Sequence, residues 1–428
     1  MGRSRRWLEE VETPHRTLRF RTLIIVAAAV ASLVAPGASL AAPTEEGSPK
    51  QAENYRLQWN MKAMAAHALF TSRPEVRGDT DILAAVVDTG IDYLHPDLGI
   101  RRNADGSAGD GGLVDLKLST SLLGLTPSGT TCPTGDPGMP YRKVAPATNG
   151  EDAWAVGLGR DPSTDFHSHG TAVAGLIASQ GGLLAGVTQR TTLFSVKVHG
   201  ASRQNCLSVY LAGIRYAADQ GADVIHLSIP LEFPRAGNDA AVENATAALE
   251  YAHAKGAVLV AAAGNATTNL DDLSRFRFCQ GAHVICVGAT GPASADTIDE
   301  PFWDEIASYS NFGAAIDVVG PGGTGTFPNQ IVPVWLTCSQ VTVVMTGAPG
   351  ACSRGDKEIW ASTGTSFGAA ATSGLAALLK SIRPAATPDE IETLITSTAE
   401  DYPAAPGEDP YYGSGRINVI EAVIAAQH

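Results

Sequence analysis

The sequence is poor in charge, in basic residues and in long apolar runs. Charged residues make up 17% of the 428 positions and apolar residues 44%, a balance that excludes a disordered chain and indicates a globular one. There are 30 Lys and Arg against 44 Asp and Glu, and the net charge of −14 argues against nucleic acid as a partner. The length allows one large domain or two smaller ones.

Only one uncharged run, residues 22–44, is both long and apolar enough to cross a membrane. Arg16, Arg19 and Arg21 directly precede it, and its apolar core "LIIVAAAVASLV" is followed by the small residues of "ASLAAP". This pattern predicts a signal peptide over residues 1–41, cleaved after Ala41, which leaves a mature chain of net charge −17. The alternative is an uncleaved membrane anchor, because three glutamates make the start atypical. We therefore expect a protein that is secreted or held at the cell envelope, in contact with a membrane only if the segment stays uncleaved.

Cysteine is scarce, and no Cys-x-x-Cys pair occurs, which argues against a cysteine zinc cluster. Six cysteines in an exported chain indicate up to three disulfides, although 15 pairings are possible in principle. From their proximity in sequence we expect the pairs Cys279–Cys286 and Cys338–Cys352, which leaves Cys132–Cys206.

Apolar runs alternate with helical patterns from residue 81 onward. The runs "ILAAVVD", "TLFSVKVH", "DVIHLSI", "AVLVAAAG" and "VICVGAT" are typical of buried strands, and amphipathic stretches separate them. The pattern predicts an α/β fold with a doubly wound, mostly parallel sheet and helices on both faces. A further helix should start at "TPDE", where Thr387 caps, Pro388 takes the first helical position and Glu390 completes a capping box.

The predicted domain organisation is simple. A short linker over residues 42–54 should lead into one domain over 55–428. Residues 100–165 and 322–360 break the alternating rhythm and are typical of surface insertions, which are either close to the functional site or merely decorative.

Reactive side chains stand at the ends of three predicted elements. Asp88 ends a buried strand, His169 begins a helix in "HSHGTAVAG", and Ser366 begins another in "STGTSFGAA". In a doubly wound fold such ends meet at the crevice along the carboxyl edge of the sheet. A serine hydroxyl needs an adjacent base, and the base needs an acid that fixes its tautomer. Asn265, after "VLVAAAG", could donate to an oxyanion.

Several stretches, in this order, resemble the subtilisin-like serine proteases, the subtilases. They include "VVDTGIDYLHPDL", "HGTAVAG", "ADVIHLSI", "VLVAAAGN", "SYSNFG" and "GTSFGAAATSG". The resemblance implies a secreted serine endopeptidase with Asp88, His169 and Ser366 as its triad and Asn265 in its oxyanion hole. It also implies that protein or peptide substrates bind as an added strand. The walls of that cleft would be Ser228, Ile229 and Pro230 on one side and Ala262, Ala263 and Gly264 on the other.

The chain departs from the family in three places, and the linker over residues 42–54 leaves no room for the folding prodomain that many exported members carry. Pro230 stands where a glycine is usual, and Ala370 stands where a proline is usual. The segment "ASQGGLLAGV" is short and has no acids, and Asp97 alone does not make a calcium site. We therefore expect no metal site and no required cofactor, with calcium possible but without a clear site. These departures and the missing prodomain leave open a catalytically silent binding protein, and a weaker alternative is an esterase.

Each of these residues also has an ordinary explanation when taken alone. An aspartate at a strand end, a serine at a helix start and a Gly-Asn turn are all common. We expect His95, His226 and His283 to be structural or surface residues, and His167 to play no part in catalysis. A monomer is expected.

Overall fold

The computed structural model describes residues 48–102, 111–123, 150–201, 206–228, 231–294, 305–326, 329–342, 358–401, 407 and 409–428. The chain divides into a unit of residues 1–41 and a unit of residues 42–428. The predicted signal peptide lies outside the described residues, and every described helix and strand belongs to the second unit. No helix within the described ranges is both long and apolar enough to cross a membrane.

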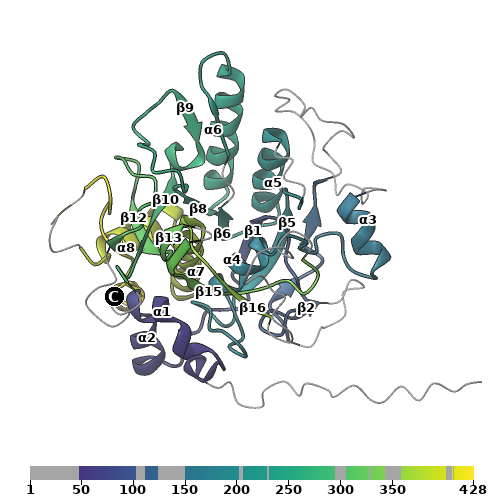
Figure 1. The fold of residues 1–428 in the computed structure, drawn as a ribbon, viewed down its shortest axis with the longest axis vertical. Coiled ribbons are helices and arrows are strands. Elements are labelled where there is room, and N and C mark those ends of the chain that lie inside the picture. The colour runs from purple at the N-terminus through teal and green to yellow at the C-terminus, as the bar shows by residue number, and fades with distance from the viewer. Residues whose placement is uncertain are drawn as a thin grey trace, which may run out of the picture. The chain divides into compact units, whose positions relative to one another are not determined.

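A ten-stranded sheet forms the centre of this unit (Figure 1). Its strands are, in spatial order, β11 (Glu305–Ile306), β10 (Val284–Gly291), β8 (Val258–Ala262), β6 (Val224–Leu227), β1 (Leu83–Asp88), β5 (Thr192–Lys197), β3 (Val114–Asp115) and β2 (Ile100–Arg102). Two more strands lie off this path: β12 (Val318–Pro321) beside β10 and β4 (Thr120–Ser121) beside β5. All of the pairs are parallel except β10–β11. The predicted mostly parallel sheet is thus confirmed.

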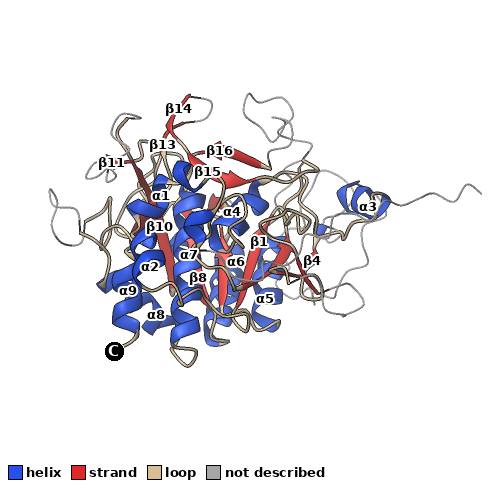
Figure 2. Ribbon diagram, turned by 90° about the horizontal axis from the view of Figure 1, so that it is seen from below, coloured by secondary structure: helices blue, strands red, loops and turns tan. Residues whose placement is uncertain are grey.

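Helices cover both faces of the sheet, as the alternation of patterns predicts (Figure 2). The described helices are α1 (Trp59–Ala63), α2 (Ala66–Ser72), α3 (Gly150–Gly157), α4 (His169–Ile177), α5 (Leu207–Asp219), α6 (Asp239–Ala254), α7 (Thr365–Ile382), α8 (Pro388–Ser397) and α9 (Val419–Ala426). The side chains of strand β1 point alternately to the two faces of the sheet. Ala84 and Val86 pack in one apolar core with α4 and α7, whereas Ala85 and Val87 pack in a second core with α5 and α6. This is why the strand is apolar throughout.

The segments predicted as linker and insertions contain regular structure. Within the linker, the backbone amides of Glu53 and Asn54 donate to the carbonyls of Gly182 and Leu183. The described part of the first insertion includes β2, β3, β4 and α3. The second holds the hairpin β13 (Thr324–Thr326) and β14 (Asn329–Val332) and the antiparallel pair β15 (Val334–Thr337) and β16 (Ile359–Ser362). A further pair joins β7 (Glu232–Pro234) to β9 (Arg275–Arg277).

The structure contains the disulfide Cys279–Cys286, which joins the turn before β10 to β10 itself. Cys206 and Cys338 are also disulfide-bonded. Their predicted partners Cys132 and Cys352 lie outside the described residues, so those two pairings stay predictions.

Helix α4 starts unusually close to the end of β1. A Cβ atom on Gly170 would lie 2.0 Å from the carbonyl oxygen of Gly90, so no other residue fits there without moving the backbone. Ser168, just before the helix, has a left-handed backbone with φ of 81°. A non-glycine residue in this region is strained and has to be held in place by its surroundings.

The buried carboxylate of Asp165 holds this helix start. Oδ1 accepts the backbone amides of His167 and Ser168 at 2.8 and 2.9 Å, and Oδ2 accepts the amide of Thr171 at 2.9 Å. The hydroxyls of Thr89 and Thr171 donate to the same carboxylate at 2.9 and 2.7 Å. A negative charge at a helix N-terminus is favourable in itself. Asp165 therefore fixes the position of α4 relative to the residue after β1.

We predict that Asp165→Asn destabilises the protein by about 3 kcal/mol, because an amide group turns one acceptor atom into a donor that faces other donors. Chemical denaturation in a Ser366→Ala background, which prevents self-digestion if the protein is active, measures this. Asp79→Asn is the matched control. Asp79 accepts one backbone amide from Asp81 at 2.9 Å, but it is exposed. Equal and small losses for the two variants would contradict the assigned role.

Candidate active site

The structure brings Asp88 and His169 into direct contact at the carboxyl edge of the sheet. Asp88 is the last residue of β1 and is fully buried. His169 is the first residue of α4, and its Nδ1 lies 2.8 Å from Oδ1 and 3.0 Å from Oδ2 of Asp88. Because a carboxylate only accepts, Nδ1 carries the proton and Nε2 is left with its lone pair. Asp88 thus holds the imidazole in the tautomer in which Nε2 can accept a proton.

Ser366 lies at the start of α7, where it is the second helical residue. Its side chain is buried, and Oγ donates to the backbone carbonyl of Ser228 at 3.1 Å. The ring of the next residue, Phe367, is 6.3 Å from the imidazole of His169 between centroids. The nucleophile predicted from the sequence therefore lies on the same side of the sheet as the predicted base.

Ser228 connects the acid to the serine. It follows directly after β6, which pairs with β1. Its hydroxyl donates to Oδ2 of Asp88 at 3.0 Å, while its carbonyl accepts the hydroxyl of Ser366. Asp88 is thus bound to His169 on one side and to Ser228 on the other. Two hydrogen bonds of one residue tie the ends of β1 and α7 together.

A buried histidine continues this network behind Asp88. His226 lies on β6, with Nε2 2.7 Å from Oγ of Ser228 and Nδ1 2.9 Å from Oγ of Ser373 on α7. Since the Ser228 hydroxyl donates to the carboxylate, it has to accept from His226, so the proton of His226 is on Nε2. Nδ1 then accepts from Ser373. The donors run in one direction, from Ser373 through His226 and Ser228 to Asp88.

The charges follow from these contacts. Burial by itself raises the pKa of Asp88, but the neighbouring His169 and the hydrogen bonds from His169 and the Thr89 amide together hold it well below its ordinary value. Burial lowers the pKa of His226 to about 4, against the opposing attraction of Asp88. The site therefore has an anionic carboxylate flanked at neutral pH by an uncharged His226.

Asn265 lies three residues after β8, and Thr365 fixes its orientation. Its Oδ1 accepts both the backbone amide and the hydroxyl of Thr365, each at 2.9 Å. The Nδ2 amide is consequently turned the other way, and it has no hydrogen-bond partner within the described part of the chain. Asn265 is exposed, whereas Ser366 is buried. The amide group is thus an available donor beside the start of α7.

Asn311 supports the loop that carries Asn265. Its Nδ2 donates to the carbonyl of Ala263 at 2.8 Å, and its Oδ1 accepts the amides of Ala266 and Thr268 at 3.1 and 2.9 Å. Gly264 has φ of 105°, and a Cβ there would lie 2.5 Å from Nδ2 of Asn311. The close contact requires a glycine at this position.

The residues expected to form the cleft are only partly described. Ser228 is buried, Ala262 is half-buried at the end of β8, and Ala263 and Gly264 follow it. Because β6 and β8 are neighbours, these two groups lie beside each other at the same edge of the sheet. Ile229 and Pro230 lie outside the described residues.

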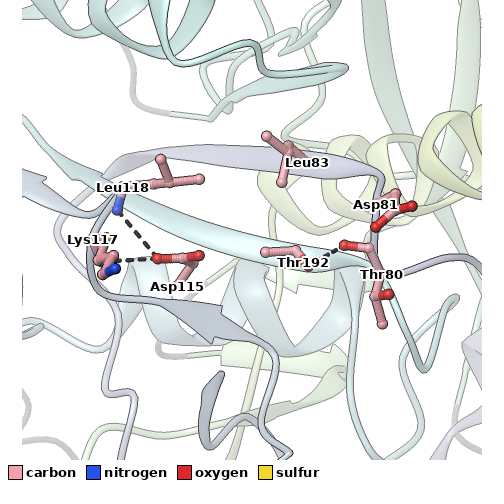
Figure 3. A pocket seen from close by; sticks show the side chains of 7 residues that line it. All are labelled: Thr80, Asp81, Leu83, Asp115, Lys117, Leu118 and Thr192. Carbon is pink, nitrogen blue, oxygen red and sulfur yellow. Dashed lines mark hydrogen bonds between the residues drawn. The ribbon is translucent and has the colours of Figure 1, made fainter. Parts of the chain in front are cut away.

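A shallow hollow elsewhere on the surface is not part of this site (Figure 3). It lies at the first residues of β1 and β5, and Leu83 and Thr192 line it together with Asp115. Asp115 accepts the amides of Lys117 and Leu118 at 2.9 and 3.3 Å. Strands β1 and β5 are parallel, so this hollow is at the edge of the sheet opposite to Asp88.

Sequence reasoning missed three residues that organise the site. His226 is a structural histidine, one of the two alternatives expected, but its place was not foreseen: it is fully buried and joined to Asp88 through Ser228. Asp165 and Asn311 hold the loops that carry His169 and Asn265. The signal for Asp165 is an acid shortly before a helix start, which is a recognisable capping pattern. No local pattern distinguishes His226 or Asn311.

Comparisons with known proteins identify the family of this chain. A model of the subtilase family matches residues 79–415. A thermophilic serine proteinase of Bacillus sp. (strain AK1) is 30% identical over 350 residues, which cover 81% of this chain but only 63% of the relative, less than two thirds of its length. Subtilisin DY of Bacillus licheniformis is 28% identical over 62% of this chain and 80% of its own.

A solved structure shares the fold. The epidermin leader peptide processing serine protease of Staphylococcus aureus matches with a TM-score of 0.63 at 19% identity, over 89% of this chain and 83% of its own. The strand order, the match over most of the chain and the relatives all point to one conclusion. The chain belongs to the subtilase family of serine peptidases.

Proposed function

We propose that the protein is an endopeptidase in which Asp88, His169 and Ser366 form the catalytic triad. The observation that carries the proposal is the pair of short contacts from Nδ1 of His169 to the buried Asp88 carboxylate. Ser366 lies two hydrogen bonds away through Ser228. Its hydroxyl has to turn from the Ser228 carbonyl to Nε2 of His169, and hydrogen bonds of this kind often tighten only when substrate binds.

In the proposed reaction, Oγ of Ser366 attacks the peptide carbonyl and His169 takes the hydroxyl proton. The imidazolium then protonates the leaving amine, and Asp88 stabilises the charge that His169 carries in between. Water repeats the cycle on the acyl-enzyme. The oxyanion would be held by Nδ2 of Asn265 and the backbone amide of Ser366, which is at a helix N-terminus and points outward.

Protein or peptide chains are the proposed substrates, bound as an added strand between the segments after β6 and β8. Supporting this, the relatives are proteinases by name, and the matching Staphylococcus enzyme processes a leader peptide. The signal-like segment at residues 1–41 supports a secreted or envelope location. We propose that the protein acts as a monomer.

We propose that the reaction needs no cofactor. Asp97, which matches a calcium ligand in some subtilases, accepts the backbone amides of Leu183 and Leu184 at 2.7 and 2.9 Å. Both carboxylate oxygens therefore hold the segment after α4 in place. No observation favours the silent binding protein over the enzyme. Ala370 is buried in an unbroken α7, so the missing proline does not disturb the helix.

Ser366→Ala should abolish labelling by a fluorophosphonate probe and hydrolysis of casein, because the attacking oxygen is removed. Gel fluorescence of the purified protein measures the labelling. Ser381→Ala is the control, since Ser381 lies at the far end of the same helix and donates to the Leu378 carbonyl. Unchanged labelling of the Ser366 variant would refute the assignment, and a folded parent protein that is not labelled at all would favour the silent alternative.

Asn265→Ala should lower kcat by roughly 10²–10³-fold with little change in KM, the range measured when such a donor is removed from subtilisin. Steady-state kinetics on a peptide amide substrate test this. Asn265→Asp is the matched variant. It keeps an acceptor for Thr365 but presents a negative charge to the oxyanion, so its kcat should be at least as low. Full activity of the Asp variant would show that Asn265 only orders the loop.

The pKa of about 4 at His226 predicts acid sensitivity. As pH falls from 6.5, the unfolded chain takes up this proton before the folded one does, so stability is complete above 6.5 and decreases towards 4. His226 alone should contribute a loss of about 3 kcal/mol. Denaturation curves between these pH values, in the Ser366→Ala background, should be flatter for His226→Asn. Parallel curves would contradict the prediction, and replacing the exposed His428 should leave the slope unchanged.

A further inference from the structure

Three side chains that are far apart in sequence meet at the edge of the sheet opposite to the triad. His253 lies in the last turn of α6, His283 directly precedes β10, and Asp389 is in the first turn of α8. One potential ligand atom from each lies within 4.8 Å of the other two. Since β8 and β10 are parallel and begin next to these residues, the cluster is far along the strands from Asp88 and the carboxyl ends.

The two imidazoles converge on one carboxylate oxygen. Nε2 of His253 is 2.7 Å and Nδ1 of His283 is 3.3 Å from Oδ1 of Asp389. The rings are stacked, with centroids 3.8 Å apart and planes inclined by 16°. The backbone of His283 is in the left-handed conformation, with φ of 63°. Glu392, one turn further along α8, is half-buried and interacts electrostatically with all three groups.

We propose that His253, His283 and Asp389 form a zinc site. Imidazole nitrogens with a carboxylate oxygen are ligands that suit Zn²⁺, whereas Ca²⁺ and Mg²⁺ prefer oxygen alone. Bonds of about 2.1 Å in a tetrahedron place ligand atoms roughly 3.4 Å apart. The three ligand atoms already lie within 4.8 Å of one another, and the stacked rings have to tilt apart to direct both nitrogens at one ion. Water completes the coordination.

The position of the site assigns it a structural role. The metal would join the end of α6, the turn before β10 and the start of α8 at the surface. A ligand that binds only the folded chain stabilises it by mass action. Zinc at this site therefore raises stability and leaves peptide hydrolysis unaffected, and the inference does not depend on the triad assignment.

The test is calorimetric titration of the Ser366→Ala protein with zinc chloride, followed by thermal unfolding with and without zinc. We expect one saturable site per chain and a rise in Tm on the order of 2 °C at tenfold excess over Kd. His283→Ala and His253→Ala should each weaken binding at least tenfold and remove the rise in Tm. His428→Ala, which changes another exposed histidine, should do neither, and calcium chloride should not substitute for zinc.

Undiminished zinc binding in both His253→Ala and His283→Ala would overturn the proposal, as would the absence of saturable binding to the parent protein. His283 is exposed in a surface turn, so its variant keeps the test decisive even if His253→Ala fails to fold.

Discussion

The buried carboxylate of Asp88 is the group on which the arrangement of the site depends. A charge at this depth is costly unless each oxygen has partners, and here the partners come from different parts of the chain: the Thr89 amide, the His169 imidazole and the Ser228 hydroxyl. Satisfying Asp88 therefore requires β6 to lie beside β1 and α4 to start close to its end. The same contacts that neutralise the penalty of burial also orient the imidazole.

Close backbone approach makes these contacts possible. The absence of a side chain at Gly170 lets α4 touch the backbone of Gly90, and the five hydrogen bonds to Asp165 keep it there. On the other side of the site, Asn311 and Gly264 determine the path of the loop with Asn265. The reactive side chains are thus positioned by neighbours that take no part in chemistry. Such support is what keeps a site preorganised.

Local patterns predicted much of this structure, and long-range contacts account for what they missed. The capping box of Thr387 and Glu390 forms as expected, because it involves only four consecutive residues. Continuous apolar runs indicated a sheet covered on both faces, and β1 indeed faces two cores. The role of His226 depends on which strand lies beside β1 and on Ser373 of α7, which no window of sequence contains. His253 and Asp389 are 136 residues apart in sequence, so no local pattern predicts their contact either.

The direction of the hydrogen bonds behind Asp88 has a consequence for how protons move. Ser373, His226 and Ser228 each donate towards the carboxylate, and His169 donates to it from the opposite side. None of these groups presents a lone pair to Asp88, so a proton on the carboxylate would have no acceptor to leave by. With the hydrogen bonds in this direction, the network does not carry a proton from Asp88 into the interior. Under the proposed mechanism, a proton that His169 takes up therefore leaves again through Nε2 and not through Asp88.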